Sequence, residues 1–151
     1  MTLDPEWRQH LVELLLPLSR RWRGAAGAAF EELGVTLAVA APILTVARLG
    51  DGVRQNVVAD EVGVDAAALV RTVDVLEKSG LMERRVDPKD RRAKTLHLTT
   101  EGRTMAARLL AVYEPFRDSI VSGVSEADGA TAIRVLRAID AATREKTNAR
   151  F

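Results

Sequence analysis

Apolar residues recur along most of the chain with the spacing of amphipathic helices. In residues 4–33 large apolar side chains return at steps of three and four, which gathers them on one helix face. Asp4 followed by Pro5 is a typical helix start, with an N-cap and a proline at the first helical position. A second helix is expected over residues 36–49, with a bend or a late start at Pro42. The apolar face of the first helix consists of Leu3, Trp7, Leu11, Leu14, Leu15 and Leu18.

The middle of the chain predicts two short helices and then a β-hairpin. The helices are expected to cover Gln55–Val62 and Ala66–Ser79. The apolar period then changes to alternation in Leu81–Val86 and Lys94–Leu98, which is the pattern of short strands. The polar, turn-rich residues 87–93 between them are expected to form the loop of the hairpin.

Two longer helices are predicted for the last third of the chain. One begins at Thr99 or Thr100 and reaches about Gly123, and the other begins after Ser125. The terminal helices carry more apolar surface than a small central module covers, so they are expected to pack against a second copy of the chain. The sequence therefore predicts a mainly α homodimer with a small β-hairpin in the middle of each chain.

Composition indicates a folded domain with a localised basic patch. The 151 residues are 47% apolar and 28% charged, enough to bury a core and keep a polar surface. Lys and Arg number 22 against 21 Asp and Glu, and the net charge of +1 argues against a histone-like coat for nucleic acid. Residues 84–94, however, hold six basic and two acidic side chains, a net +4 against −3 for the rest of the chain. A loop of that charge suits phosphate contact and insertion of arginine into a narrow minor groove, although charge runs are also typical of solvated surface.

Residue types that the chain lacks disfavour several functional classes. Without Cys there is no thiolate metal site and no thiol-based redox sensor, and two distant histidines, His10 and His97, disfavour a zinc site. No nucleophile–base pair, phosphate-cradling glycine loop or metal cluster stands out, so we expect neither an enzyme nor a cofactor or metal. No signal peptide or membrane-spanning stretch is visible, and we expect a cytoplasmic protein with no membrane partner.

The two short central helices have the spacing of a helix–turn–helix. Ala59 is small enough for a helix crossing, Gly63 allows a positive φ in the turn, and Leu69 anchors the second helix. Asp65 is expected to cap that second helix. An ordinary helical hairpin with a solvated charged face fits these residues equally well, and it is the basic hairpin directly after them that favours DNA binding.

Several segments resemble a known family. Residues 69–81, LVRTVDVLEKSGL, resemble the recognition-helix region of MarR-family transcriptional regulators, and residues 87–94, DPKDRRAK, resemble the family's wing. Residues 98–103, LTTEGR, close the wing in the same way. The segments most similar to the SlyA-like branch of the family are LVRT at 69–72, DRRAK at 90–94 and RWR at 21–23.

The resemblance implies a fold, a domain organisation and two partners. It implies a single MarR-like domain over residues 1–151, built as a winged helix–turn–helix domain plus N- and C-terminal dimerisation helices. Residues 36–99 would form the winged helix–turn–helix lobe, and residues 1–34 and 100–151 the dimerisation helices. The implied partners are double-stranded operator DNA, bound as a pseudo-palindrome, and a second copy of the chain.

The resemblance also implies which residues contact DNA. Arg71 corresponds to the main recognition-helix contact, to a guanine edge or a phosphate. Arg92 matches the wing arginine that enters the minor groove, and Asp90 matches the acid that orients the wing arginines. The recognition helix opens with alanines where relatives have proline or hydroxyl residues, which leaves apolar contact with thymine methyl groups. The full set of expected DNA contacts is Ala67, Ala68, Arg71, Thr72, Arg84, Arg85, Lys89, Asp90, Arg91, Arg92 and Lys94.

A small aromatic or phenolic effector is a further implication of the family. It would bind in a cleft between the dimerisation helices and the DNA-binding lobe, where Trp22 supplies an aromatic wall and Arg23 a cation for a carboxylate. Plain core packing is the alternative for Trp22. The second helix would contribute small apolar residues, which suggests a roomier cleft or a different ligand. The expected ligand contacts are Trp22, Arg23, Ala38, Ala41 and Leu44, with Ala40 beside them.

Three functions can be weighed on these grounds. The leading one is a sequence-specific, dimeric DNA-binding regulator that a small ligand modulates. The alternative is a winged-helix module for architectural DNA binding or protein interaction, without a ligand response. An enzyme has little support, because Asp90 has no visible partner for acid–base chemistry.

Overall fold

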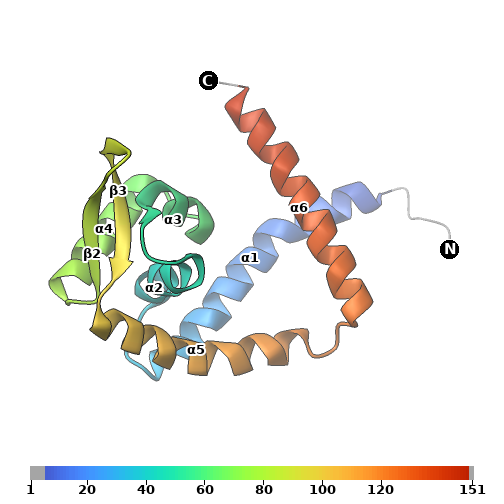
Figure 1. Cartoon of the computed structure of the whole chain (residues 1–151). Coiled ribbons are helices and arrows are strands. Elements are labelled where there is room, and N and C mark those ends of the chain that lie inside the picture. Colours follow the sequence, from blue (N-terminus) through green and yellow to red (C-terminus); the bar gives the residue numbers. More distant parts are fainter. Residues whose placement is uncertain (1–5, 150–151) are drawn as a thin grey trace. The chain divides into compact units, whose positions relative to one another are not determined.

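The computed structural model describes residues 6–149, which form six helices and one small sheet (Figure 1). The chain divides into two compact units, residues 1–116 and 117–151. The prediction of a mainly α fold with a small β wing is confirmed, and the division between the units falls inside α5. In chain order the elements are α1 (Trp7–Glu31), α2 (Leu37–Leu49), β1 (Val53–Arg54), α3 (Gln55–Val62), α4 (Ala66–Lys78), β2 (Met82–Asp87), β3 (Asp90–Leu98), α5 (Thr100–Val121) and α6 (Glu126–Asn148).

The strands form one antiparallel sheet in the order β1–β3–β2. Asp87 pairs with Asp90 around a tight turn at Pro88-Lys89, so the hairpin ladder reaches almost to the tip. The predicted loop over residues 87–93 is therefore wrong, because β3 begins at Asp90. The strand β1 was not predicted, since two residues are too short to show an alternating pattern.

Local hydrogen bonds explain how the central helices begin and end. As predicted, Asp65 is the N-cap of α4, and its Oδ1 accepts a hydrogen bond from the backbone N of Ala68 at 2.7 Å. Gly63 has a φ of 75° in the turn between α3 and α4. This left-handed conformation costs glycine nothing, which is why the helix–turn–helix has glycine there.

The first two helices differ from expectation at their starts. α1 begins at Trp7, and the Asp4-Pro5 start predicted for it lies outside the described residues. α2 begins at Leu37 and contains Pro42. Of the two effects predicted for this proline, a bend or a late helix start, the late start is therefore wrong.

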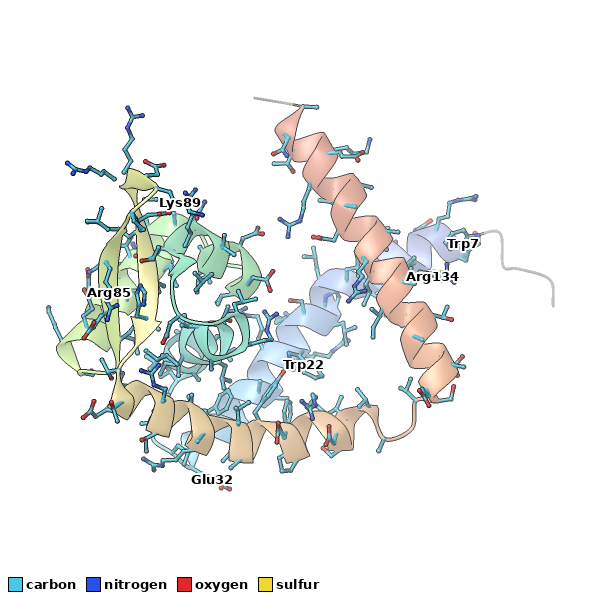
Figure 2. The ribbon with its side chains drawn as sticks, in the orientation of Figure 1. Trp7, Trp22, Glu32, Arg85, Lys89 and Arg134 are labelled. Carbon is cyan, nitrogen blue, oxygen red and sulfur yellow. The ribbon has the colours of Figure 1, made fainter. Side chains whose placement is uncertain are left out.

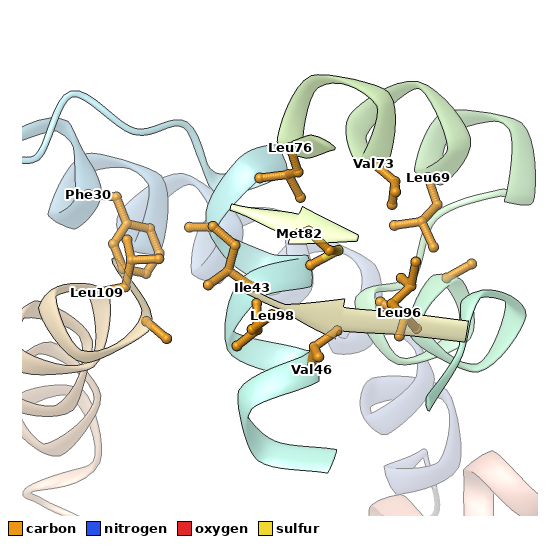
Figure 3. Close-up of a cluster of buried hydrophobic side chains, with 14 residues drawn as sticks. Phe30, Ile43, Val46, Leu69, Val73, Leu76, Met82, Leu96, Leu98 and Leu109 are labelled. Atoms are coloured by element: carbon orange, nitrogen blue, oxygen red, sulfur yellow. The ribbon is translucent and has the colours of Figure 1, made fainter. Parts of the chain in front are cut away.

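A single hydrophobic cluster holds the first unit together (Figure 3). Leu69, Val73 and Leu76 project into it from α4, as their spacing predicts, and each is at most 1% exposed. Full burial of one such side chain contributes about 1.5–3 kcal/mol, so packing helps to hold α4 against the sheet. The cluster comprises Phe30, Ala40, Ile43, Val46, Val58, Ala59, Leu69, Val73, Leu76, Met82, Leu96, Leu98, Ala106 and Leu109.

The start of α5 is bonded to the turn that joins α4 to β2. Thr99 donates from its backbone N to the carbonyl of Leu81 at 3.2 Å and from its hydroxyl to the carbonyl of Gly80 at 2.6 Å. The same hydroxyl accepts a hydrogen bond from Gly102 N at 3.0 Å, which makes Thr99 the cap of α5. The end of α4, the start of β2 and the start of α5 therefore meet at one seam.

The second unit consists mainly of α6. This helix begins after Ser125 as expected, and Ser125 caps it, its hydroxyl oxygen accepting a hydrogen bond from Asp128 N at 3.1 Å. None of the residues of α6 is buried within the described chain, and Ile133 and Leu136 are 52% and 49% exposed. Among the described helices, α6 included, we find none that is both long enough and apolar enough to cross a membrane.

Candidate nucleic-acid interface

The outer face of α4 presents a few predicted DNA contacts. Ala67 and Arg71 are exposed, whereas Ala68 and Thr72 are half-buried. The hydroxyl of Thr72 donates to the carbonyl of Ala68 at 3.2 Å, so its donor is used inside the helix. Arg71 forms no ion pair with any residue from 6 to 149. Of the contacts predicted on α4, Arg71 is therefore the one with donors available to a base edge or a phosphate.

Four basic side chains lie exposed at the end of the hairpin, and we call them the wing-tip cluster. Figure 2 shows Lys89 at the turn. Within the described part of the chain, none of the four is ion-paired. Asp90 accepts a hydrogen bond from the backbone N of Arg92 at 3.0 Å, so it shapes the turn without covering a guanidinium. The wing-tip cluster consists of Lys89, Arg91, Arg92 and Lys94.

Asp87, beside the turn of the wing, binds the guanidinium of an arginine on β1. Arg54 Nε of β1 donates to Asp87 Oδ2 at 2.7 Å, and the backbone N of Lys89 donates to Asp87 Oδ1 at 2.8 Å. The Asp87 side chain is only 8% exposed. The hydrogen bond from Lys89, followed by that from Arg54, lowers the pKa of Asp87 below its usual value. Asp87 thus stays charged and holds the turn against β1.

A hollow of about 340 Å³ lies between the wing and the start of α3. Arg92 and Lys94 line it from β3, and Arg54, Gln55 and Asn56 line it from the opposite segment. Asp90 lines the hollow as well, and Arg54 is paired with Asp87, so Arg92 and Lys94 are the cations that this surface offers to the oxygens of a phosphate backbone. Arg54 was missed in the sequence because β1 was missed, and its only signal is a basic residue directly before a helix start.

The neighbouring arginines of β2 lie on opposite faces of the sheet. Strand alternation turns Arg84 toward α4 and Arg85 to the other side. Arg85 is exposed (Figure 2) and pairs with Glu83 at 3.0 Å. Arg84 is only 23% exposed and is bound by Asp74 and Glu77 of α4. Both were predicted to contact DNA, yet only Arg85 lies on open surface.

The two predicted ligand contacts on α1 have separate partners. The ring centroid of Trp22 (Figure 2) lies 5.5 Å from that of Phe116 of α5, in an edge-to-face arrangement. Arg23 Nη1 instead donates to the carbonyl of Val62, the last residue of α3, at 3.1 Å. A cation is favoured at this end of a helix, where unpaired carbonyls carry partial negative charge. Trp22 thus packs against α5, and Arg23 caps α3.

The predicted ligand contacts on α2 differ in exposure. Ala38 is exposed, Ala41 and Leu44 are half-buried, and Leu44 packs against the core. Ala40 is fully buried in that core, so its expected place in an accessible cleft is wrong. For Ala38, Ala41 and Leu44 the ligand contact stays a prediction.

Comparison with known proteins agrees with this geometry. A helix–turn–helix followed by a basic antiparallel wing defines a winged helix–turn–helix protein. The model of the MarR family matches residues 33–93. A solved transcriptional regulator named PA3341 is 32% identical, and the match covers 89% of this chain and 98% of that one with a TM-score of 0.80. The chain belongs to the MarR family of transcriptional regulators.

Two other solved structures are similar to the chain. The transcriptional regulator SlyA has a TM-score of 0.75 and 18% identity over 90% of this chain and 95% of its own. CouR from Rhodococcus jostii RHA1, solved bound to p-coumaroyl-CoA, has a TM-score of 0.71 and 25% identity over 83% of this chain and 88% of its own. The similarity to SlyA is one of fold.

Proposed function

We propose that the chain acts as a homodimer that recognises a pseudo-palindromic DNA operator and regulates transcription from it. In each protomer, Arg71 contacts the major groove while Arg91 and Arg92 contact the adjacent minor groove. The observation that carries the proposal is the wing-tip cluster, in which four exposed cations without ion-pair partners in the described chain project beside a helix–turn–helix. A patch that served only solubility would not need this position.

The other predicted contacts take supporting roles in this proposal. Ala67 and Ala68 offer methyl groups to thymine at the start of the recognition helix. Lys89 and Lys94 bind phosphates as point charges, while Arg54 stays bonded to Asp87 and holds the turn beneath them. Phosphate contacts fix the register of the protein on the duplex, and base-edge contacts supply the specificity.

Exposed apolar residues support the homodimer. On α1, Leu16 is 83% exposed and Val12 is 62% exposed, four residues apart and therefore on one helix face. On α6, Ile133 and Leu136 form a similar pair three residues apart. Rows of this kind mark interaction surfaces, and a helix without buried residues depends on a partner for its stability. A second copy of the chain supplies that partner by two-fold symmetry.

A small aromatic acid is the effector that the α1–α5 region favours. The rings of Trp22, Phe116, Tyr113 and Phe30 follow one another with centroid separations of 5.5, 5.9 and 5.9 Å. CouR, similar in sequence and fold, binds an aromatic acyl thioester. An effector carboxylate that captured Arg23 would release it from the C-terminal end of α3, and so couple ligand binding to the helix–turn–helix.

The test is selection of DNA duplexes with randomised sequence by the purified chain, followed by titration at several salt concentrations. We expect an inverted repeat with half-site centres about 34–36 Å apart. We also expect log K to fall against log salt with a slope of about −0.9 for each phosphate bound. Arg71→Ala should weaken binding and relax sequence preference, and Arg92→Ala should weaken binding. The matched control is Arg48→Ala, which removes an exposed arginine of α2 paired with Glu61 and should leave DNA binding unchanged.

The outcomes separate the proposal from its alternatives. Unchanged affinity and preference in both Arg71→Ala and Arg92→Ala would contradict it. Binding without sequence preference, or with a shallow salt slope, favours the architectural or protein-interaction module. Repeating the titration with a panel of aromatic acids tests the effector, since one compound should dissociate the complex. Turnover of such a compound by the purified chain would contradict a purely regulatory function.

A further inference from the structure

Arg84 donates hydrogen bonds to the recognition helix from both its backbone and its side chain. Its backbone N donates to Glu77 Oε1 at 2.9 Å, while Nε and Nη2 donate to Glu77 Oε2 at 3.0 and 2.6 Å. Nη2 also donates to Oδ1 of Asp74. One residue of β2 is therefore tied to two carboxylates that lie one turn apart on α4.

The charges of this cluster are directed at one another. The hydrogen bond from Arg84 lowers the pKa of Glu77, and the same bond raises the pKa of Arg84. Two carboxylates and one guanidinium give a net charge of −1, which does not attract a phosphate. To reach DNA, Arg84 would have to give up hydrogen bonds to charged groups that it already makes at 23% exposure. The wing-tip cluster pays no such cost.

The two DNA-contacting parts of the lobe need a fixed relative position. Arg71 lies on α4 and Arg92 lies near the tip of the wing, and both must meet the duplex at once. Arg92 is on β3, and its hairpin partner β2 is joined to α4 through charged side chains by Arg84 with Glu77 and Asp74.

We infer that Arg84 is a positioning residue that locks the wing to the recognition helix, with Glu77 as its main anchor, and that it is not a DNA contact. The inference rests on the proposed DNA-binding function and deepens it. It also gives roles to Glu77 and Asp74, two acidic residues on the recognition helix of a protein that binds a polyanion.

The two roles of Arg84 predict opposite signs for one substitution. If Arg84 bound a phosphate, Glu77 would compete for it, and Glu77→Gln would free the arginine and strengthen DNA binding. If Arg84 positions the wing, Glu77→Gln weakens DNA binding even though it makes the lobe more positive. We expect a loss of about tenfold, equivalent to one hydrogen bond between charged groups.

The experiment measures DNA affinity and its salt dependence for the full chain and four variants. Glu77→Gln is compared with Glu61→Gln, which breaks an ion pair with Arg48 of the same 2.6 Å length between α2 and α3 and should leave binding unchanged or slightly tighter. Arg84→Gln is compared with Arg92→Gln. Arg92→Gln should reduce the salt slope by about 0.9 per protomer, whereas Arg84→Gln should weaken binding and leave the slope as it is.

A double variant and a folding measurement complete the test. The double variant of Arg84→Gln and Glu77→Gln should lose no more affinity than either single variant, because both remove one linkage. Thermal unfolding of every variant shows that it is folded at the assay temperature. Should Glu77→Gln not fold, Asp74→Asn removes one bond of the cluster and carries the same sign test.

Each result bears on a different claim. Tighter binding by Glu77→Gln, or a slope reduced by about 0.9 in Arg84→Gln, overturns the positioning role and makes Arg84 a phosphate contact. Unchanged binding by both variants overturns it as well. Absence of DNA binding by the unaltered chain overturns the proposed function first, and the role of Arg84 falls with it.

Discussion

The seam between the base of the wing and α5 leaves no room for a side chain at Gly102. A Cβ at this position would lie 3.0 Å from the carbonyl carbon of Leu81 and 3.4 Å from Leu98 Cδ2, and closer still to the oxygen of Leu81. That oxygen also accepts the hydrogen bond from Thr99 N at 3.2 Å. The obstacle is backbone held in place by its own bonds, so relief requires the seam to open.

Gly102→Ala should therefore destabilise the fold. Forcing a methyl group into a filled site costs about 1–3 kcal/mol. Alanine recovers roughly 0.5–1 kcal/mol relative to glycine within a helix. Taken at mid-range, the net loss of about 1 kcal/mol corresponds to a fall in the unfolding midpoint of about 2–4 °C for a chain of this size.

The assay is thermal unfolding followed by circular dichroism at one fixed protein concentration, because the midpoint of a dimer depends on concentration. The control is Gly24→Ala in α1, where an added Cβ meets nothing within 4 Å. Gly24→Ala should raise the free energy of unfolding by up to about 1 kcal/mol, and with it the midpoint temperature. The reasoning is refuted if Gly102→Ala is as stable as the unaltered chain, or if the two variants shift the midpoint in the same direction.

Three other predictions concern caps, pH and assembly. Asp65→Ala removes the hydrogen bond that caps Ala68 N and should lower the free energy of unfolding by about 1 kcal/mol, measured by denaturant unfolding. An unchanged free energy of unfolding would mean that the cap is dispensable. The pKa of Asp87 is lower in the folded chain than its ordinary value of 3.8, so the carboxylate stabilises the fold fully above pH 3.8. This stabilisation is lost as the pH falls through the folded pKa. In Asp87→Asn, the free energy of unfolding should therefore fall less steeply on the acid side of a stability–pH profile. Leu16→Glu, at a position 83% exposed, should dissociate the dimer in sedimentation, and an unaltered dimer would place the interface elsewhere.

The sequence predicts those parts of the fold that strong local signals define. The bounds of α3 agree with expectation because Gly63 ends that helix, and α4 begins where expected because Asp65 caps it. The length of the hairpin was not predicted, because Asp87 and Asp90 are turn-forming residue types that tertiary pairing placed in a ladder. Propensity is a weak guide where pairing with a neighbouring strand decides the conformation.

The sequence predicts where the candidate site lies, but it does not separate the roles of the basic residues within it. Residue type alone cannot separate Arg84 from Arg85, whereas strand alternation can. Met82 is buried, so a residue two positions on shares its face and points toward α4. Glu77, seven residues before Arg84, can be predicted as its partner only when Arg84 is known to lie on the face of β2 that is turned toward α4.

Ion-pair partners decide how much of the basic segment acts on DNA. Residues 84–94 include six cations. Arg84 and Arg85 are paired with acids, whereas the four cations of the wing-tip cluster have no ion-pair partner among the described residues. If the four cations of that cluster each bind one phosphate, the wings of a dimer contribute about −7 to the salt slope, against about −11 for all six. The difference is measurable by replacing the four wing-tip cations with Gln, which should remove the wing's contribution while the ion pairs of Arg84 and Arg85 stay in place. A remaining wing contribution of about −3 to −4 would mean that Arg84 and Arg85 leave their carboxylates for the phosphates, and that the ion pairs of the free protein do not persist on DNA.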